Sequence, residues 1–103
     1  MTWEEKVEMI QLSNQANDRE SRKKFLEYVL KHIEKFDKQA YDMFINGLSL
    51  LPDEMKEDTE YHKQIFPYIK KELENGNQGL RTSLRLAMYV TIFEKEVNLN
   101  ITK

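Results

Sequence analysis

The stretch from Leu80 to Val97 constrains the fold most, because its middle is apolar on every side of a helix. The apolar residues there are Leu84, Leu86, Ala87, Met88, Tyr89, Val90, Ile92 and Phe93. A helix that is apolar all round has to be covered by other elements. We therefore expect this segment to be the central helix of a small helical domain, with water excluded from every side. Substitution of Leu84 or Met88 by Asp should then unfold the chain.

The middle of the same segment has a second interpretation as a buried strand, since its aromatic and β-branched residues favour strands. Its length decides in favour of a helix. The segment is too long for one ordinary strand, and Glu94, Lys95 and Glu96 continue it without a turn signal.

The first half of the chain carries start signals for two helices. Thr2 and Glu5 have the spacing of a capping box, and Asn17 with Glu20 repeats that spacing. The apolar residues that follow the first signal at helical spacing are Trp3, Val7 and Ile10. We expect one amphipathic helix after each signal.

The stripe of the second helix continues in register to Leu48, so one helix over residues 18–46 is an alternative. Such a helix would be roughly 43 Å long, more than a compact domain of this size accommodates. Asp37 can cap a new helix, and Phe36 and Tyr41 are placed to form a hydrophobic staple. A break near Asp37 is favoured.

Glycine and proline mark the remaining boundaries. Gly47 predicts a helix end in the left-handed conformation, Pro52 predicts a helix start, and Gly76 predicts the next end. Pro67 lies inside the pattern between them and predicts a kink or two short helices. Residues 97–103 alternate apolar and polar, which is typical of an extended or frayed tail. Together the patterns predict an all-α fold: a single-domain bundle over residues 1–103, with four to five helices around the apolar C-terminal helix.

Composition narrows the class of protein. A length of 103 residues suits one domain, and a formal net charge of -2 argues against a general nucleic-acid binder. The chain has no cysteine, so disulfides and thiolate zinc sites are excluded. The polar N-terminus is no signal peptide, and no apolar run reaches the ~20 residues of a membrane span. We expect a cytoplasmic protein of a low-GC bacterium or its phage, without membrane association.

No residue pattern predicts catalysis or a bound cofactor. Asp58 and His62 stand four apart and could share a metal on a helix, but zinc needs three or four ligands, so a solvated acidic turn is the better interpretation. His32 beside an apolar stripe is a boundary residue and not a general base. The glycines match no phosphate loop, and no serine has a nucleophile-elbow context. We expect no enzyme, no metal and no cofactor.

Charged clusters and exposed apolar residues are the candidates for a partner surface. An acidic cluster suits either a docking surface or a solubilising face, and Arg81 with Arg85 places cations at a helix start, where they are mildly unfavourable. The candidate residues are Asp53, Glu54, Glu57, Asp58, Glu60, Arg81, Arg85 and Trp3.

The expected function is binding to another protein or to a second copy of the chain, as an inhibitor, an immunity or antitoxin factor, or an assembly or accessory factor. Its main support is the number of large apolar residues, which is greater than one small core can bury. The alternative is a nucleic-acid-binding regulator that uses Arg81 and Arg85 or the basic cluster at Arg19, Arg22, Lys23 and Lys24.

Overall fold

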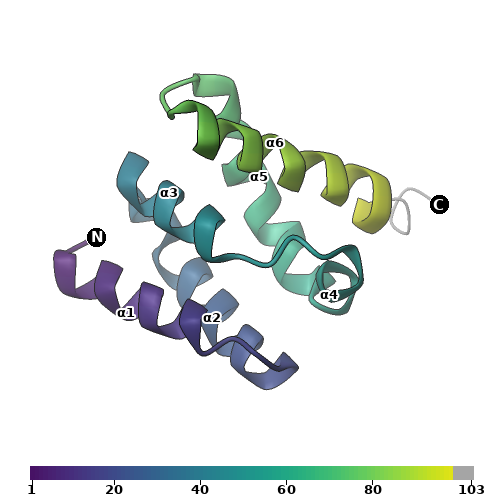
Figure 1. The fold of residues 1–103 in the computed structure, drawn as a ribbon, viewed down its shortest axis with the longest axis horizontal. Coiled ribbons are helices and arrows are strands. Elements are labelled where there is room, and N and C mark those ends of the chain that lie inside the picture. Colours follow the sequence, from purple (N-terminus) through teal and green to yellow (C-terminus); the bar gives the residue numbers. More distant parts are fainter. Residues whose placement is uncertain (99–103) are drawn as a thin grey trace. The chain divides into compact units, whose positions relative to one another are not determined.

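The computed structural model describes residues 1–98, and every regular element in that range is a helix (Figure 1). The α-helices are α1 (Trp3–Asn14), α2 (Arg19–His32), α3 (Lys38–Gly47), α4 (Pro52–Glu57), α5 (Thr59–Asn75) and α6 (Leu80–Ile92). A short 3-10 turn, η1 (Ile33–Lys35), follows α2, and a π-helical turn, η2 (Phe93–Val97), follows α6. The all-α prediction is confirmed, and the last apolar segment is a helix and not a strand. Of the predicted tail, residues 99–103 lie outside the described residues.

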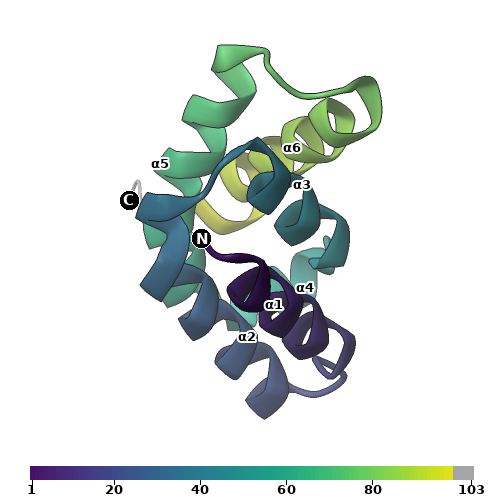
Figure 2. The same ribbon diagram turned by 90° about the vertical axis from the view of Figure 1, so that its left-hand side faces the viewer.

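The helices group into two compact units, Met1–Leu48 and Ser49–Lys103, called here the N-terminal and C-terminal units. In the N-terminal unit, α1 contacts both α2 and α3 (Figure 2). Aromatic rings of α2 and α3 pack together, with the Phe25 and Phe44 ring centroids 5.8 Å apart. The buried apolar residues of this unit are Met9, Phe25, Leu26, Val29, Ile33, Ala40, Tyr41, Phe44, Ile45 and Leu48.

Side-chain caps start the first two helices. The capping box of α1 is formed: the Thr2 backbone N–H donates to the Glu5 carboxylate at 2.8 Å, and the Glu5 N–H donates to the Thr2 hydroxyl at 3.2 Å. For α2 the expected cap is wrong by one residue. Asp18 and not Asn17 is the cap, with its carboxylate 2.8 Å from the Ser21 backbone N–H. Both residue types suit the position, so local chemistry alone does not fix the register.

The predicted break near Asp37 is confirmed. After η1, the Asp37 carboxylate accepts from the Ala40 backbone N–H at 2.8 Å and begins α3. The Phe36 and Tyr41 rings meet edge to face with centroids 5.2 Å apart, as the staple requires. The long apolar stripe is therefore divided between two helices.

Gly47 does not take the left-handed conformation that its sequence context predicts. It is the last residue of α3, and among the described residues only Gly76 has a positive φ, 67°. A Cβ at Gly47 would lie 2.8 Å from the Ser13 hydroxyl oxygen, so a larger residue here would force the Ser13 side chain or the two helices to shift where α1 and α3 approach closely. Gly76 caps α5 as predicted.

In the C-terminal unit, α5 packs against α6, and η2 contacts α4 and α5. The Phe66 and Phe93 rings stack with centroids 4.1 Å apart. The buried apolar residues of this unit are Met55, Ile65, Ile69, Leu86, Tyr89, Phe93 and Val97.

The two short helices expected around Pro67 are not found, because α5 continues through this residue. The ring of Pro67 is exposed, and so is Lys63, whose carbonyl would accept the missing hydrogen bond. Water can solvate that carbonyl, which makes the interruption tolerable. The actual break lies earlier, at Asp58, between α4 and α5.

A candidate protein-binding surface on helix α6

Helix α6 has one side that is built into the C-terminal unit. Leu86 and Tyr89 are completely buried, and Thr82 is nearly so. These positions lie three or four residues apart and therefore share one face of a helix. This buried face fixes α6 against α5.

The opposite side of α6 is open to water, so the expectation that water is excluded from every side is wrong. Leu80 is 78% exposed, Leu84 is 57% exposed and Met88 is 49% exposed. Within the C-terminal unit α6 packs chiefly against α5 and η2, which leave one side of the helix uncovered. Because Leu84 and Met88 are exposed, the structure gives no reason for aspartate there to unfold the chain.

Large and small residues form two neighbouring rows on this open side. Residues four apart line up along a helix. The large row is Leu80, Leu84, Met88 and Ile92, and the small row is Ser83, Ala87 and Thr91. We call the two rows together the α6 face. The rows form a ridge of bulky side chains beside a shallow groove.

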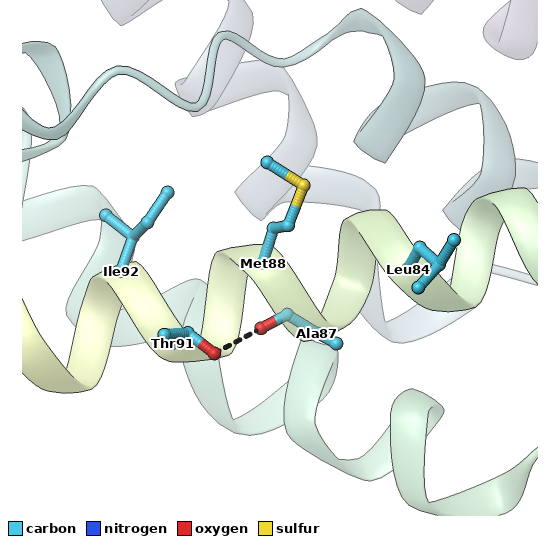
Figure 3. Close-up of a pocket in the computed structure, with 5 residues that line it drawn as sticks. All are labelled: Leu84, Ala87, Met88, Thr91 and Ile92. Atoms are coloured by element: carbon cyan, nitrogen blue, oxygen red, sulfur yellow. Dashed lines mark hydrogen bonds between the residues drawn. The ribbon is translucent and has the colours of Figure 1, made fainter.

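A pocket of about 280 Å³ lies on the α6 face (Figure 3). Its lining residues are Leu84, Ala87, Met88, Thr91 and Ile92. Figure 3 shows Met88 and Ile92 pointing the same way from α6, with Ala87 and Thr91 beside them. The Thr91 hydroxyl donates to the Ala87 carbonyl at 2.9 Å. Because that bond occupies the hydroxyl proton within the helix, the pocket wall is almost entirely apolar.

Positive charge borders the α6 face at its N-terminal end. Arg81 is exposed and Arg85 is half-buried, and no residue from 80 to 92 is acidic. The N-cap, Gly79, offers no side-chain acceptor to the first turn. The helix dipole is also positive at this end. At the other end, Glu96 pairs with Lys56 at 3.4 Å.

A buried polar pair lies on the inner side of α6. The Tyr89 hydroxyl and His62 Nδ1 are 2.8 Å apart, and His62 is 1% exposed. Burial raises the pKa of Tyr89 well above its ordinary value, so the phenol stays protonated and can donate to the ring. The pair ties α5 to α6 and thereby holds the outer face in place. Within residues 1–98 no three or more His, Asp or Glu side chains gather in a way that could hold a metal ion.

The acidic cluster predicted from the sequence is only partly on the surface. Asp53, Glu57 and Glu60 are exposed, whereas Asp58 is buried at 2% exposure. Glu54 is half-buried and accepts from the Ser49 hydroxyl at 2.9 Å. Three of these five acids are thus exposed on the surface.

The remaining candidates lie in the N-terminal unit. Trp3 is 61% exposed on α1, while Lys6 on the same helix is buried and its ammonium is 2.8 Å from the Asp37 carboxylate. His32 is buried, with Nδ1 3.5 Å from a Glu5 oxygen. In the basic cluster, Arg19 and Lys24 are exposed. Arg22 and Lys23 are half-buried.

Sequence reasoning missed the α6 face, because it took the same residues for core. The signal that could have found it is the spacing: large residues recur every four positions, next to a row of small ones. The residues of α6 that are buried in the core lie in a separate row, which consists of Thr82, Leu86 and Tyr89.

Comparison with known proteins finds no matching family model, no similar curated protein and no similar solved structure. In residues 1–98, none of the helices has both the length and the apolar character needed to cross a membrane.

Proposed function

We propose that this chain acts by binding another protein through the α6 face. The observation that carries the proposal is the exposure of Leu80, Leu84 and Met88 along one line of a helix. Covering such apolar surface releases about 25 cal/mol per Å². Contiguous exposed apolar surface with a polar border is typical of protein interaction sites.

The α6 face is also formed in the free chain, before a partner binds. Its helix is fixed from behind by Leu86 and by the bond between Tyr89 and His62. A preformed surface loses little conformational freedom on binding, so more of the contact energy appears as affinity. This supports a binding role for a small cytoplasmic protein, such as an inhibitor, an immunity or antitoxin factor, or an assembly factor.

The alternative of nucleic-acid binding is less well supported. Arg81 and Arg85 border an apolar surface, and two cations give only a weak attraction to a phosphate backbone.

Site-specific photo-crosslinking tests the proposal. A photoreactive phenylalanine analogue replaces Leu84 in one variant and Lys63, an exposed residue of α5, in a matched control. Both are expressed in the cells that produce the protein and irradiated. We expect a discrete crosslinked product from position 84 and none from position 63, identified by mass spectrometry.

Competition then shows whether the product depends on the α6 face. Excess unmodified chain should suppress it, and a Leu84→Ser/Met88→Ser double variant should not. A crosslink to a second copy of the chain would identify a homodimer as the partner. Equal crosslinking from both positions, or none from position 84, contradicts the proposed function.

A further inference from the structure

We propose that Met88 is a site of reversible oxidation and that its sulfoxide abolishes binding at the α6 face. The inference rests on the proposed function and adds to it a means of regulation. It comes from the position of this thioether on the α6 face and from its exposure, which no other methionine in residues 1–98 shares.

Met88 carries the most accessible sulfur in the part of the chain that the structure describes. The chain has five methionines and no cysteine, so no thiol competes for an oxidant. Met88 is 49% exposed, whereas Met9 and Met55 are each 1% exposed. Met1 and Met43 are half-buried. A buried thioether reacts only after local opening of the fold, so peroxide should reach Met88 first.

Met88 also lies where a change of polarity interrupts the α6 face. It is the third of the four residues in the large row, and it lines the pocket together with Leu84 and Ile92. Figure 3 shows its side chain extending from α6 between those two residues. Because the wall of the pocket is almost entirely apolar, an oxygen on this sulfur places a polar group within the apolar row.

The reaction needs a peroxide and no catalytic group of the chain. Hydrogen peroxide transfers one oxygen atom to Met88 Sδ: the sulfur lone pair forms an S–O bond, the O–O bond breaks, and the displaced oxygen leaves as water. The sulfur loses two electrons and the peroxide gains them. The sulfoxide is polar, whereas the thioether is a flexible apolar group. Methionine sulfoxide reductases restore the thioether with electrons from thiols, which makes the change reversible.

Oxidation should change the α6 face without unfolding the chain. The Met88 side chain is on the open side of α6, and the buried side is held by Leu86 and Tyr89. An apolar partner surface would cover the sulfoxide oxygen without offering it a hydrogen bond, and burial of an unpaired polar group opposes binding.

Peptide mapping tests the modification without a partner. The full chain is treated with dilute hydrogen peroxide, the reaction is stopped with catalase, and mass spectrometry quantifies the sulfoxide at each methionine over time. We expect Met88 to be oxidised about tenfold or more faster than Met9 and Met55. The melting temperature should stay within about 3 °C when Met88 is oxidised. Oxidation of Met88 no faster than that of Met55, or unfolding at that stage, overturns the inference.

The photo-crosslinking variant at position 84 tests the effect on binding. It is oxidised, treated with catalase and added to a lysate of the producing cells before irradiation. We expect the discrete product to decrease about tenfold or more on oxidation and to return after treatment with methionine sulfoxide reductases. Met88→Leu keeps an apolar side chain of similar volume, so this matched control should form the product equally before and after peroxide. Met88→Gln is polar and should form little product without peroxide.

The outcomes separate this inference from the proposed function. A product that forms equally from the oxidised chain overturns the regulation but leaves binding at the α6 face in place. Loss of the product after peroxide in the Met88→Leu control as well assigns the loss to another residue and also overturns it. Absence of a product from the untreated chain contradicts the proposed function, and the regulatory role of Met88 fails with it.

Discussion

Leu84 and Leu86 lie two positions apart on α6 but face opposite ways, so they form a matched pair of substitutions. Leu86 is completely buried, and its change to Ala leaves a cavity that costs about 2–5 kcal/mol of unfolding free energy. Leu84 is 57% exposed, so less than half of its surface is buried and Leu84→Ala loses less than half of the free energy of burying a leucine side chain. Because complete burial of such a side chain contributes about 1.5–3 kcal/mol, the loss in unfolding free energy is about 1 kcal/mol or less.

Alanine also forms helices slightly better than leucine, but this gain of a few tenths of a kcal/mol applies to both variants and cancels in the comparison. The two variants should therefore differ by about 1–4 kcal/mol, which separates their urea midpoints by about 0.5–2 M at a denaturant slope of about 2 kcal/mol/M. Urea unfolding followed by far-UV circular dichroism measures this difference. Equal losses for the two variants would show that Leu84 is covered in solution, and the reasoning behind the α6 face would fail.

Three further predictions concern other parts of the molecule. Tyr89→Phe removes the buried hydrogen bond between the Tyr89 hydroxyl and His62 Nδ1 and should cost about 1–3 kcal/mol in thermal or urea unfolding; no loss would contradict the role of the buried pair. The hydrogen bond from Lys6 lowers the pKa of Asp37 below its ordinary 3.8, so Asp37 stabilises the fold fully above that pH and loses this contribution as pH falls through the folded pKa. The stability gap between wild type and Asp37→Asn should therefore shrink below about pH 4 and stay constant at neutral pH; a gap independent of pH would refute this. Gly47→Ala places a Cβ 2.8 Å from the Ser13 hydroxyl and should cost about 1–3 kcal/mol, partly recovered by adding Ser13→Ala; an unchanged melting temperature would count against the close approach of α1 and α3.

Signals that act over a few residues were predictable from the sequence. The capping box at Thr2 and the cap at Asp37 depend on a side chain and a backbone N–H three positions away. The start at Pro52 and the left-handed Gly76 depend on backbone geometry in the same way. Each of these interactions is complete within one turn, so no knowledge of tertiary packing is needed.

Signals that depend on a distant neighbour were not predictable. The sequence around Gly47 predicts a left-handed helix end. The structure instead places Gly47 against Ser13, more than 30 positions away in the chain, where a Cβ would be crowded. On α1 the apolar residue Trp3 is exposed and the charged residue Lys6 is buried, because Asp37 and Gln39 accept from its ammonium, each at 2.8 Å. Burial depends on which elements meet, and periodicity alone does not reveal that.

The same limit explains the candidate site. An apolar face indicates that a side of a helix avoids water, but it does not say whether the chain or a partner covers that side. In α6 both rows of residues are apolar, so the sequence pattern allows either row to be the buried one. Only the packing against α5 shows that the row with Leu86 is buried and that the row with Leu84 is exposed.

Methionine methyl groups offer the most direct measurement of whether the α6 face is open. With methyl-labelled methionine, a soluble gadolinium chelate broadens only the NMR signals of methyl groups that water reaches. Met88 is 49% exposed, whereas Met9 and Met55 are each 1% exposed. We predict that the Met88 signal broadens strongly in the free chain while those of Met9 and Met55 persist. A Met88 signal as protected as that of Met55 would contradict an open α6 face.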